Sequence, residues 1–153
     1  MRSACIRQPV SAASRGSRLA LAVVANRMLR WSERDLTEFF GVSAFYDDAP
    51  HSYGFETSRD GLRLLVTLFD LEGAVYVSIF RDGLPEPLFT VRRELCSHAH
   101  VTQDARFRRC FEAGAPKLPV TDMGIPPVLT RGVRVYIEPQ FQVELIEPRY
   151  ENG

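Results

Sequence analysis

The sequence is poor in several residue types, and each scarcity excludes a class of protein. Only one of its 19 basic residues is a lysine, Lys117, and it has only three cysteines. An odd number of cysteines does not fit a disulfide scaffold and favours a reducing compartment, although Cys96 and Cys110 remain free to pair. No apolar run approaches the roughly 20 residues that span a bilayer. We therefore expect a cytoplasmic protein with no membrane partner.

Signatures of common enzyme classes are missing as well. The chain has no Gly-x-Ser-x-Gly elbow, no Cys-x-x-Cys pair and no glycine-rich phosphate loop. Residues 1–32 lack acids and carry six arginines, while the remainder has 13 basic and 19 acidic residues, a net charge of −6. Because phosphate binding needs a clustered basic surface, this acidic main body argues against a nucleic-acid partner.

The start of the chain differs from the rest in composition. Residues 1–17 are rich in serine, alanine and arginine and have no useful periodicity, so we expect a disordered basic tail. The alternative is a cleaved targeting signal over residues 1–25, with which the protein would be exported or sent to an organelle. Whether residues 1–27 belong to the native protein stays open. We divide the chain into a tail at 1–17, a single α+β domain at 18–148 and a frayed end at 149–153.

A helix is predicted at the start of the domain. Ser32 and Asp35 form a capping pattern, and Gly41 supplies the stop. Three apolar residues recur between them at helical spacing: Leu36, Phe39 and Phe40. We expect a helix over about residues 18–40, broken near Ser32, that covers one face of a sheet.

Strands follow this helix. Asp60-Gly61 is a strong hairpin signal, and a turn centred on Leu71-Glu72 gives a second hairpin in register with the first. Both registers set apolar residues opposite one another on the same face, which a slip of one residue would destroy. The expected strands are Ser52–Ser58, Leu62–Phe69, Ala74–Arg81 and Leu88–Leu95, and the expected pairs include Phe55 with Val66, Thr57 with Leu64, and Val66 with Val77.

The C-terminal half is less regular. Helical spacing of apolar residues predicts a short helix over residues 104–111, and the glycines and prolines of residues 114–131 predict a long loop. Either a three-residue turn at Glu138 to Gln140 pairs Val135 with Val143 in a last hairpin, or one long strand bends at Pro139, and we favour the hairpin. The elements together predict an α+β fold, in which an N-terminal helix packs on an antiparallel β-meander of about five to six strands.

The second face of the meander is neither a core nor a solvated surface. Apolar side chains alternate there with polar ones such as Arg63, Thr67 and Ser78. Residual apolar patches of this kind mark contact surfaces. We therefore predict a surface that binds a protein partner or a second copy of the chain, formed by Leu65, Phe69, Tyr76 and Phe80.

A different chemistry is offered by Cys96, His98 and His100. If the fourth strand continues to His100, the three side chains share one face and could bind zinc, with Asp104 or His51 as a fourth ligand. A thiol dyad of Cys96 or Cys110 with His98 is a further possibility. The simpler interpretation is a polar strand end with no cofactor.

Two classes of function follow from these observations. The preferred one is a non-catalytic protein-binding module, comparable in size and architecture to adaptors, small chaperones and immunity proteins. The alternative is a small metal-dependent or thiol hydrolase centred on Cys96, His98 and His100. The catalytic residues of such an enzyme are not identified by any motif.

Overall fold

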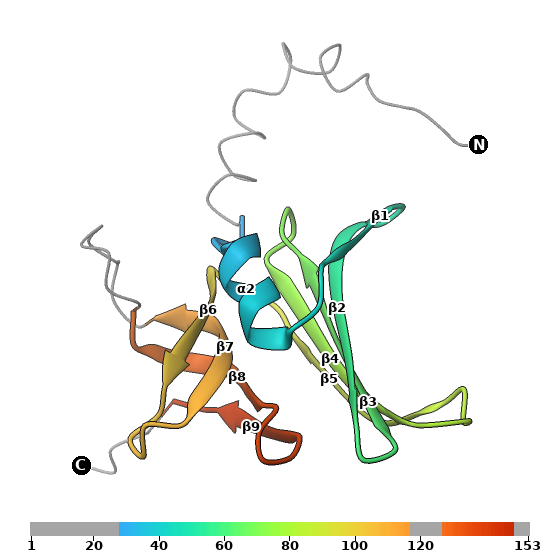
Figure 1. Cartoon of the computed structure of the whole chain (residues 1–153). Helices are drawn as coiled ribbons and strands as arrows, with labels where there is room; N and C mark the ends of the chain where they lie inside the picture. The colour runs from blue at the N-terminus through green and yellow to red at the C-terminus, as the bar shows by residue number, and fades with distance from the viewer. Residues whose placement is uncertain (1–27, 117–126, 149–153) are drawn as a thin grey trace.

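The computed structural model describes residues 28–116 and 127–148, which form two antiparallel sheets and one short helix (Figure 1). The first sheet has five strands in the order β1-β2-β3-β4-β5, and the second has four in the order β6-β7-β8-β9. The elements are α2 (Glu33–Phe40), β1 (Phe45–Asp48), β2 (His51–Arg59), β3 (Leu62–Phe69), β4 (Ala74–Arg81), β5 (Pro87–Arg93), β6 (His98–Gln103), β7 (Arg109–Pro116), β8 (Leu129–Tyr136) and β9 (Gln142–Ile146).

The predicted hairpins of the first sheet are confirmed. Phe55 pairs with Val66, and Val66 pairs in turn with Val77, as the alternation of apolar residues requires. These side chains are fully buried and face the second sheet. Strand β1, which adds to β2 at the edge of the sheet, was not predicted.

The predicted fold class is wrong, because the chain does not stay in one sheet. After β5 the backbone turns at Leu95, which has a φ of 59°, and crosses to the second sheet. The backbone N–H of Cys96 still donates to the carbonyl of Gly73, just before the first sheet's β4, while that of Ser97 donates to the carbonyl of Gly114 in β7. The result is a mainly β structure in two layers rather than a helix packed on a single meander.

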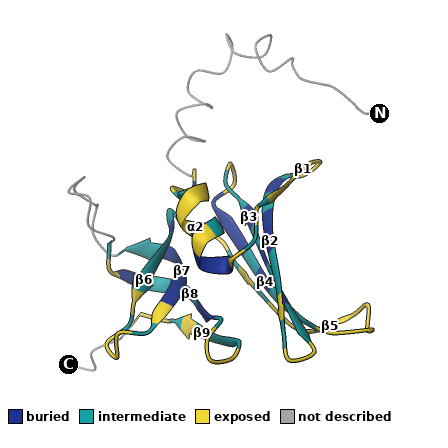
Figure 2. Cartoon of the chain, viewed as in Figure 1, coloured by how far each residue is buried: buried dark blue, intermediate teal, exposed yellow. Residues whose placement is uncertain are grey.

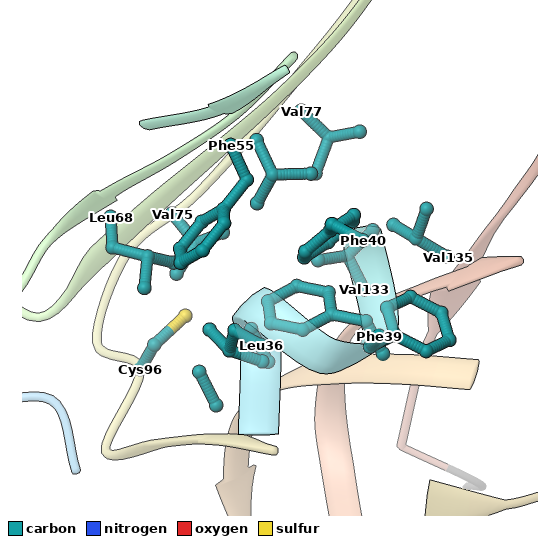
Figure 3. Packing of buried hydrophobic residues seen from close by; sticks show 14 of the residues in the cluster. Leu36, Phe39, Phe40, Phe55, Leu68, Val75, Val77, Cys96, Val133 and Val135 are labelled. Carbon is teal, nitrogen blue, oxygen red and sulfur yellow. The ribbon is translucent and has the colours of Figure 1, made fainter. Parts of the chain in front are cut away.

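Helix α2 lies between the two sheets and joins their cores. Ser32 caps it by accepting a hydrogen bond from the backbone N–H of Asp35, and Gly41 ends it with a φ of 72°, as predicted. The ring of Phe40 stacks on Phe55 of the first sheet, with centroids 5.3 Å apart, and lies 5.7 Å from Phe111 of the second. Figure 3 shows Phe40 in the shared core, with Phe55 of the first sheet and Val135 of the second.

The predicted helix over residues 104–111 is also wrong. From Arg109 the chain is strand β7, in which Phe111 and Ala113 face the core while Cys110 and Glu112 point the other way. The spacing of Phe107, Cys110 and Phe111 fits a helix only when the strand alternation that begins at Arg109 is overlooked.

The predicted loop at 114–131 is partly strand. Residues 114–116 complete β7, residues 129–131 begin β8, and residues 117–126 lie outside the described part of the chain. The last hairpin pairs Val135 with Val143, which confirms the predicted register.

The predicted tails at 1–17 and 149–153 lie outside the described residues, as does the portion of the predicted N-terminal helix before residue 28. From Met28 to Trp31 the chain is not helical, and Arg30 forms a parallel bridge with His98 at the start of β6. The described ranges contain one helix, which has eight residues. No helix in these ranges is long and apolar enough to cross a membrane.

Candidate partner-binding site

The aromatic face predicted from the sequence lies on the side of β3 and β4 that points away from the second sheet. Leu65, Phe69, Tyr76 and Phe80 are half-buried, and in the described structure no further layer covers them (Figure 2). The rings of Phe69 and Tyr76 lie 4.8 Å apart, and the guanidinium of Arg63 lies 4.6 Å from the ring of Phe80. Leu65 lies between them, opposite Ser78. The four predicted residues therefore form a continuous aromatic and aliphatic face flanked by arginine.

The structure does not bring Cys96, His98 and His100 together. Cys96 is 2% exposed and points into the core, because it lies in the crossover rather than on a strand continuous with β5 (Figure 3). His98 and His100 point to the opposite side of β6. In the described ranges no three Cys, His, Asp or Glu side chains gather closely enough to hold a metal ion. The zinc ligands predicted from the sequence are thus separated by the layer of the second sheet.

The other proposed ligands are engaged elsewhere. Nδ1 of His51 is 2.8 Å from the hydroxyl of Tyr46, and Nε2 of His51 is 2.9 Å from a carboxylate oxygen of Asp70. This chain of polar groups joins β1, β2 and the end of β3, and sequence reasoning missed it because β1 was not predicted. Asp104 lies in the turn between β6 and β7.

The histidines of β6 contact neighbouring polar groups. Nδ1 of His98 is 2.8 Å from the hydroxyl of Ser97, and burial, followed by the nearby charge of Arg30, lowers the pKa of His98. Nε2 of His100 lies 3.4 Å from the carboxylate of Glu112. His98 therefore contacts the crossover segment through Ser97, and His100 faces a carboxylate of the neighbouring strand β7.

Glu112 belongs to a row of charged side chains that crosses the second sheet. It is opposite His100 on one side and Arg134 on the other, and Glu144 follows on β9. Arg134 donates to Glu112 through Nε at 2.7 Å and approaches it through Nη2 at 2.6 Å. Burial alone would raise the pKa of Glu112, but its contacts with His100 and Arg134 outweigh burial and lower that pKa. The row is an ion-pair network centred on Glu112 and Arg134, and only the correct strand register reveals it.

Both described thiols are poorly suited to act as nucleophiles. Burial raises the pKa of Cys96 to about 11, against the opposing charges of Arg131 and Arg93. Burial, together with the charge of Glu112, also raises the pKa of Cys110 to about 11. Since the thiolate is the reactive species, both cysteines are expected to be inert in the folded protein.

Thiol labelling tests this expectation. In a Cys5→Ser variant, which removes the remaining cysteine, we expect Cys96 and Cys110 to react with a disulfide reagent at pH 8 about 100-fold more slowly when folded than in denaturant, since a pKa two units higher leaves that much less thiolate. The reaction is followed by absorbance. Rapid labelling of the folded protein at either cysteine would contradict the buried placement and would favour thiol chemistry.

A cleft is lined by residues from the end of α2, the end of β2, the start of β7 and the β8–β9 turn. Figure 1 shows the β2–β3 and β8–β9 turns at the same end of the molecule. The cleft has a volume of about 970 Å³. Phe39, Phe40 and Phe141 are among its apolar walls, and Arg59 pairs with Glu138 across its rim at 3.6 Å. Its lining comes from four separate parts of the chain, which is why no local pattern in the sequence predicted it.

Comparison with known proteins shows a shared fold. No family model matches the chain, and no curated protein matches its sequence. Its structure is similar to that of a chain in a contact-dependent growth inhibition toxin–immunity protein complex from Klebsiella pneumoniae 342, with a TM-score of 0.57 and 13% sequence identity. The similarity covers 77% of this chain and 94% of the other chain. At 13% identity the similarity establishes a shared fold. The chain that has the similar fold is part of a complex between a toxin and an immunity protein.

Proposed function

We propose that this chain is a non-catalytic protein-binding module of the immunity type, which binds a toxin made by the same cell and blocks its action. The observation that carries the proposal is the fold shared with a chain of a toxin–immunity complex over 94% of that chain. Because one fold serves many functions, the arrangement of side chains has to supply the rest of the argument.

The internal engagement of the reactive side chains favours the role of inhibitor over that of toxin. Cys96 and Cys110 are buried, and His98 and His100 are held by neighbouring polar groups. A toxin that acts as an enzyme needs reactive groups open to a substrate, whereas an inhibitor needs a rigid surface complementary to its target. The described part of the chain has the features of an inhibitor's rigid binding surface more than those of an enzyme's open reactive site.

The aromatic face of β3 and β4 remains a proposed contact surface. It combines Leu65, Phe69, Tyr76 and Phe80 with Arg63, and aromatic residues and arginine are enriched at the centres of protein interfaces. A second copy of the chain is the competing occupant of this face. Light scattering on the isolated protein distinguishes a foreign partner from a second copy. We expect a monomer, whereas a dimer would assign the face to self-association.

The proposal is tested with the toxin itself. A cell that makes a toxin needs its inhibitor at the same time, so the probe is the product of the open reading frame adjacent to the gene for this chain. The two purified proteins are mixed and separated by size-exclusion chromatography with light scattering. We expect a stable complex of one molecule of each. Separate elution of the two proteins at micromolar concentration would contradict the proposed function.

A further inference from the structure

The turn between β6 and β7 is held rigidly by Asp104. One carboxylate oxygen of Asp104 accepts hydrogen bonds from the backbone N–H groups of Arg106 and Arg108, at 2.8 Å and 2.9 Å. The other accepts from the hydroxyl of Tyr136 at 2.8 Å and from Nε of Arg108 at 3.2 Å. These bonds, the one from the Arg108 backbone foremost, lower the pKa of Asp104 to about 2. The tip of the turn therefore has little freedom to rearrange.

Phe107 stands at this tip in an unfavourable conformation. Its φ is 63°, in the left-handed region that costs an ordinary residue about 1–2 kcal/mol. Its side chain is 80% exposed, the second most exposed among the large hydrophobic residues of the described chain. A bulky residue with a positive φ is a true outlier, and such strain collects at functional sites. The turn thus holds an aromatic ring in water at a cost to stability.

Three arginines flank Phe107 along the chain, at positions 106, 108 and 109. Arg106 and Arg109 are exposed, and neither forms an ion pair with any residue of the described ranges. Arg108 is already engaged, since it pairs with Asp104 and its guanidinium lies 4.3 Å from the centre of the Tyr136 ring. The tip is therefore a local basic patch on a chain whose residues after position 32 have a net negative charge.

The turn also borders the cleft between the sheets. Arg108 and Arg109 contribute to the lining of that cleft, together with Arg59 from the end of β2. In Figures 1 and 2 the turn is an exposed projection at the same end of the molecule as the β8–β9 turn. A partner can therefore contact the exposed ring of Phe107 and the neighbouring cleft at the same time.

We propose that Phe107 is the anchor of the partner interface and that it enters an apolar pocket on the toxin, rimmed by carboxylates that pair with Arg106 and Arg109. This inference rests on the proposed function and adds to it the contact surface and the chemistry of the partner. An exposed aromatic side chain on a rigid turn, next to exposed arginines that form no ion pair in the described ranges, has the composition of an interface hot spot. The strain at Phe107 then represents stability given up for binding.

The decisive variant is Phe107→Gly, because glycine accepts a positive φ and carries no ring. We expect it to melt at a higher temperature than the wild type while its affinity for the adjacent open reading frame's product falls about 30-fold or more, as at interface hot spots. Phe107→Ala, which keeps the backbone strain, should lose the same affinity without the gain in stability. Affinity is measured by titration calorimetry and stability by thermal unfolding.

Matched controls identify the surface. Phe89→Ala removes an exposed ring from β5, Phe69→Ala tests the face of the first sheet, and Arg34→Glu is the charge control for Arg106→Glu. We expect Arg106→Glu to weaken binding at low salt, and Phe89→Ala and Arg34→Glu to bind within about threefold of the wild type. Phe69→Ala should lower the affinity less than Phe107→Ala does, because the proposal makes Phe107 the anchor.

The outcomes are distinguishable. Wild-type binding that Phe107→Gly leaves intact would overturn this inference and leave the proposed function standing. A loss confined to Phe69→Ala would also overturn it and assign the contact to the sheet face. Failure of the wild type to bind would overturn both.

Discussion

Replacing Phe40 with alanine is expected to lower the free energy of unfolding by about 3–5 kcal/mol, the range for a large aromatic residue removed from a packed core. Phe40 is 3% exposed and contacts both sheets, stacking on Phe55 and packing against Phe111. Its loss leaves a cavity at the point where the two layers meet. Because a domain of this size is stable by only about 5–15 kcal/mol, the variant should unfold at much lower denaturant concentration.

The measurement is urea unfolding followed by tryptophan fluorescence, since Trp31 packs beside Tyr53 and Phe55 near the same core. Phe89→Ala is the control, because Phe89 is 43% exposed on the edge strand β5 and its loss should cost well under half as much. Equal destabilisation by the two substitutions would contradict the role of α2 as the element that joins the sheets.

Replacing Gly114 with alanine is expected to destabilise the protein by about 3 kcal/mol or more, above the usual cost of overpacking. Gly114 on β7 is directly opposite Gly132 on β8. A Cβ at Gly114 would lie 1.9 Å from the carbonyl oxygen of Arg131, and backbone cannot move aside as a side chain can. The strands must therefore separate to admit even one methyl group.

The control for this prediction is Gly83→Ala. Gly83 has a φ of 84°, and a Cβ added there would have no atom within 4 Å, so alanine brings only the backbone strain of about 1–2 kcal/mol. Thermal and urea unfolding of both variants measure the difference. A Gly114→Ala protein as stable as the Gly83→Ala protein would contradict the close approach of β7 and β8.

Local sequence patterns were sufficient to predict the hairpins of the first sheet. They were not sufficient to predict that the strands divide between two sheets. The Asp60-Gly61 turn and the alternating valines and leucines of β3 and β4 determine their registers, because each wrong register exposes apolar residues. The crossing from one sheet to the other depends on a single left-handed residue, Leu95, and no sequence pattern marks it. Continuing β5 through Leu95 gave the false expectation that Cys96 shares a face with His98.

The candidate sites differ in the same way, because a site formed within neighbouring strands was predicted and sites formed by distant segments were not. The aromatic face of β3 and β4 follows from alternation within two strands, so it was predicted. The cleft and the turn at Phe107 depend on contacts between distant segments, such as the hydrogen bond from Tyr136 to Asp104. Phe107 itself was assigned to a helix, since its spacing from Cys110 and Phe111 is helical and its positive φ leaves no trace in the sequence.

The most direct test of the central claim is growth. The open reading frame adjacent to the gene for this chain is expressed from an inducible promoter in a host that lacks both genes, with and without co-expression of the chain. We predict that induction arrests growth, that the wild-type chain restores it, and that the Phe107→Gly protein, although folded and more stable, does not restore it. An induced product that arrests growth equally with and without the wild-type chain would contradict the assignment of this protein as an immunity-type inhibitor.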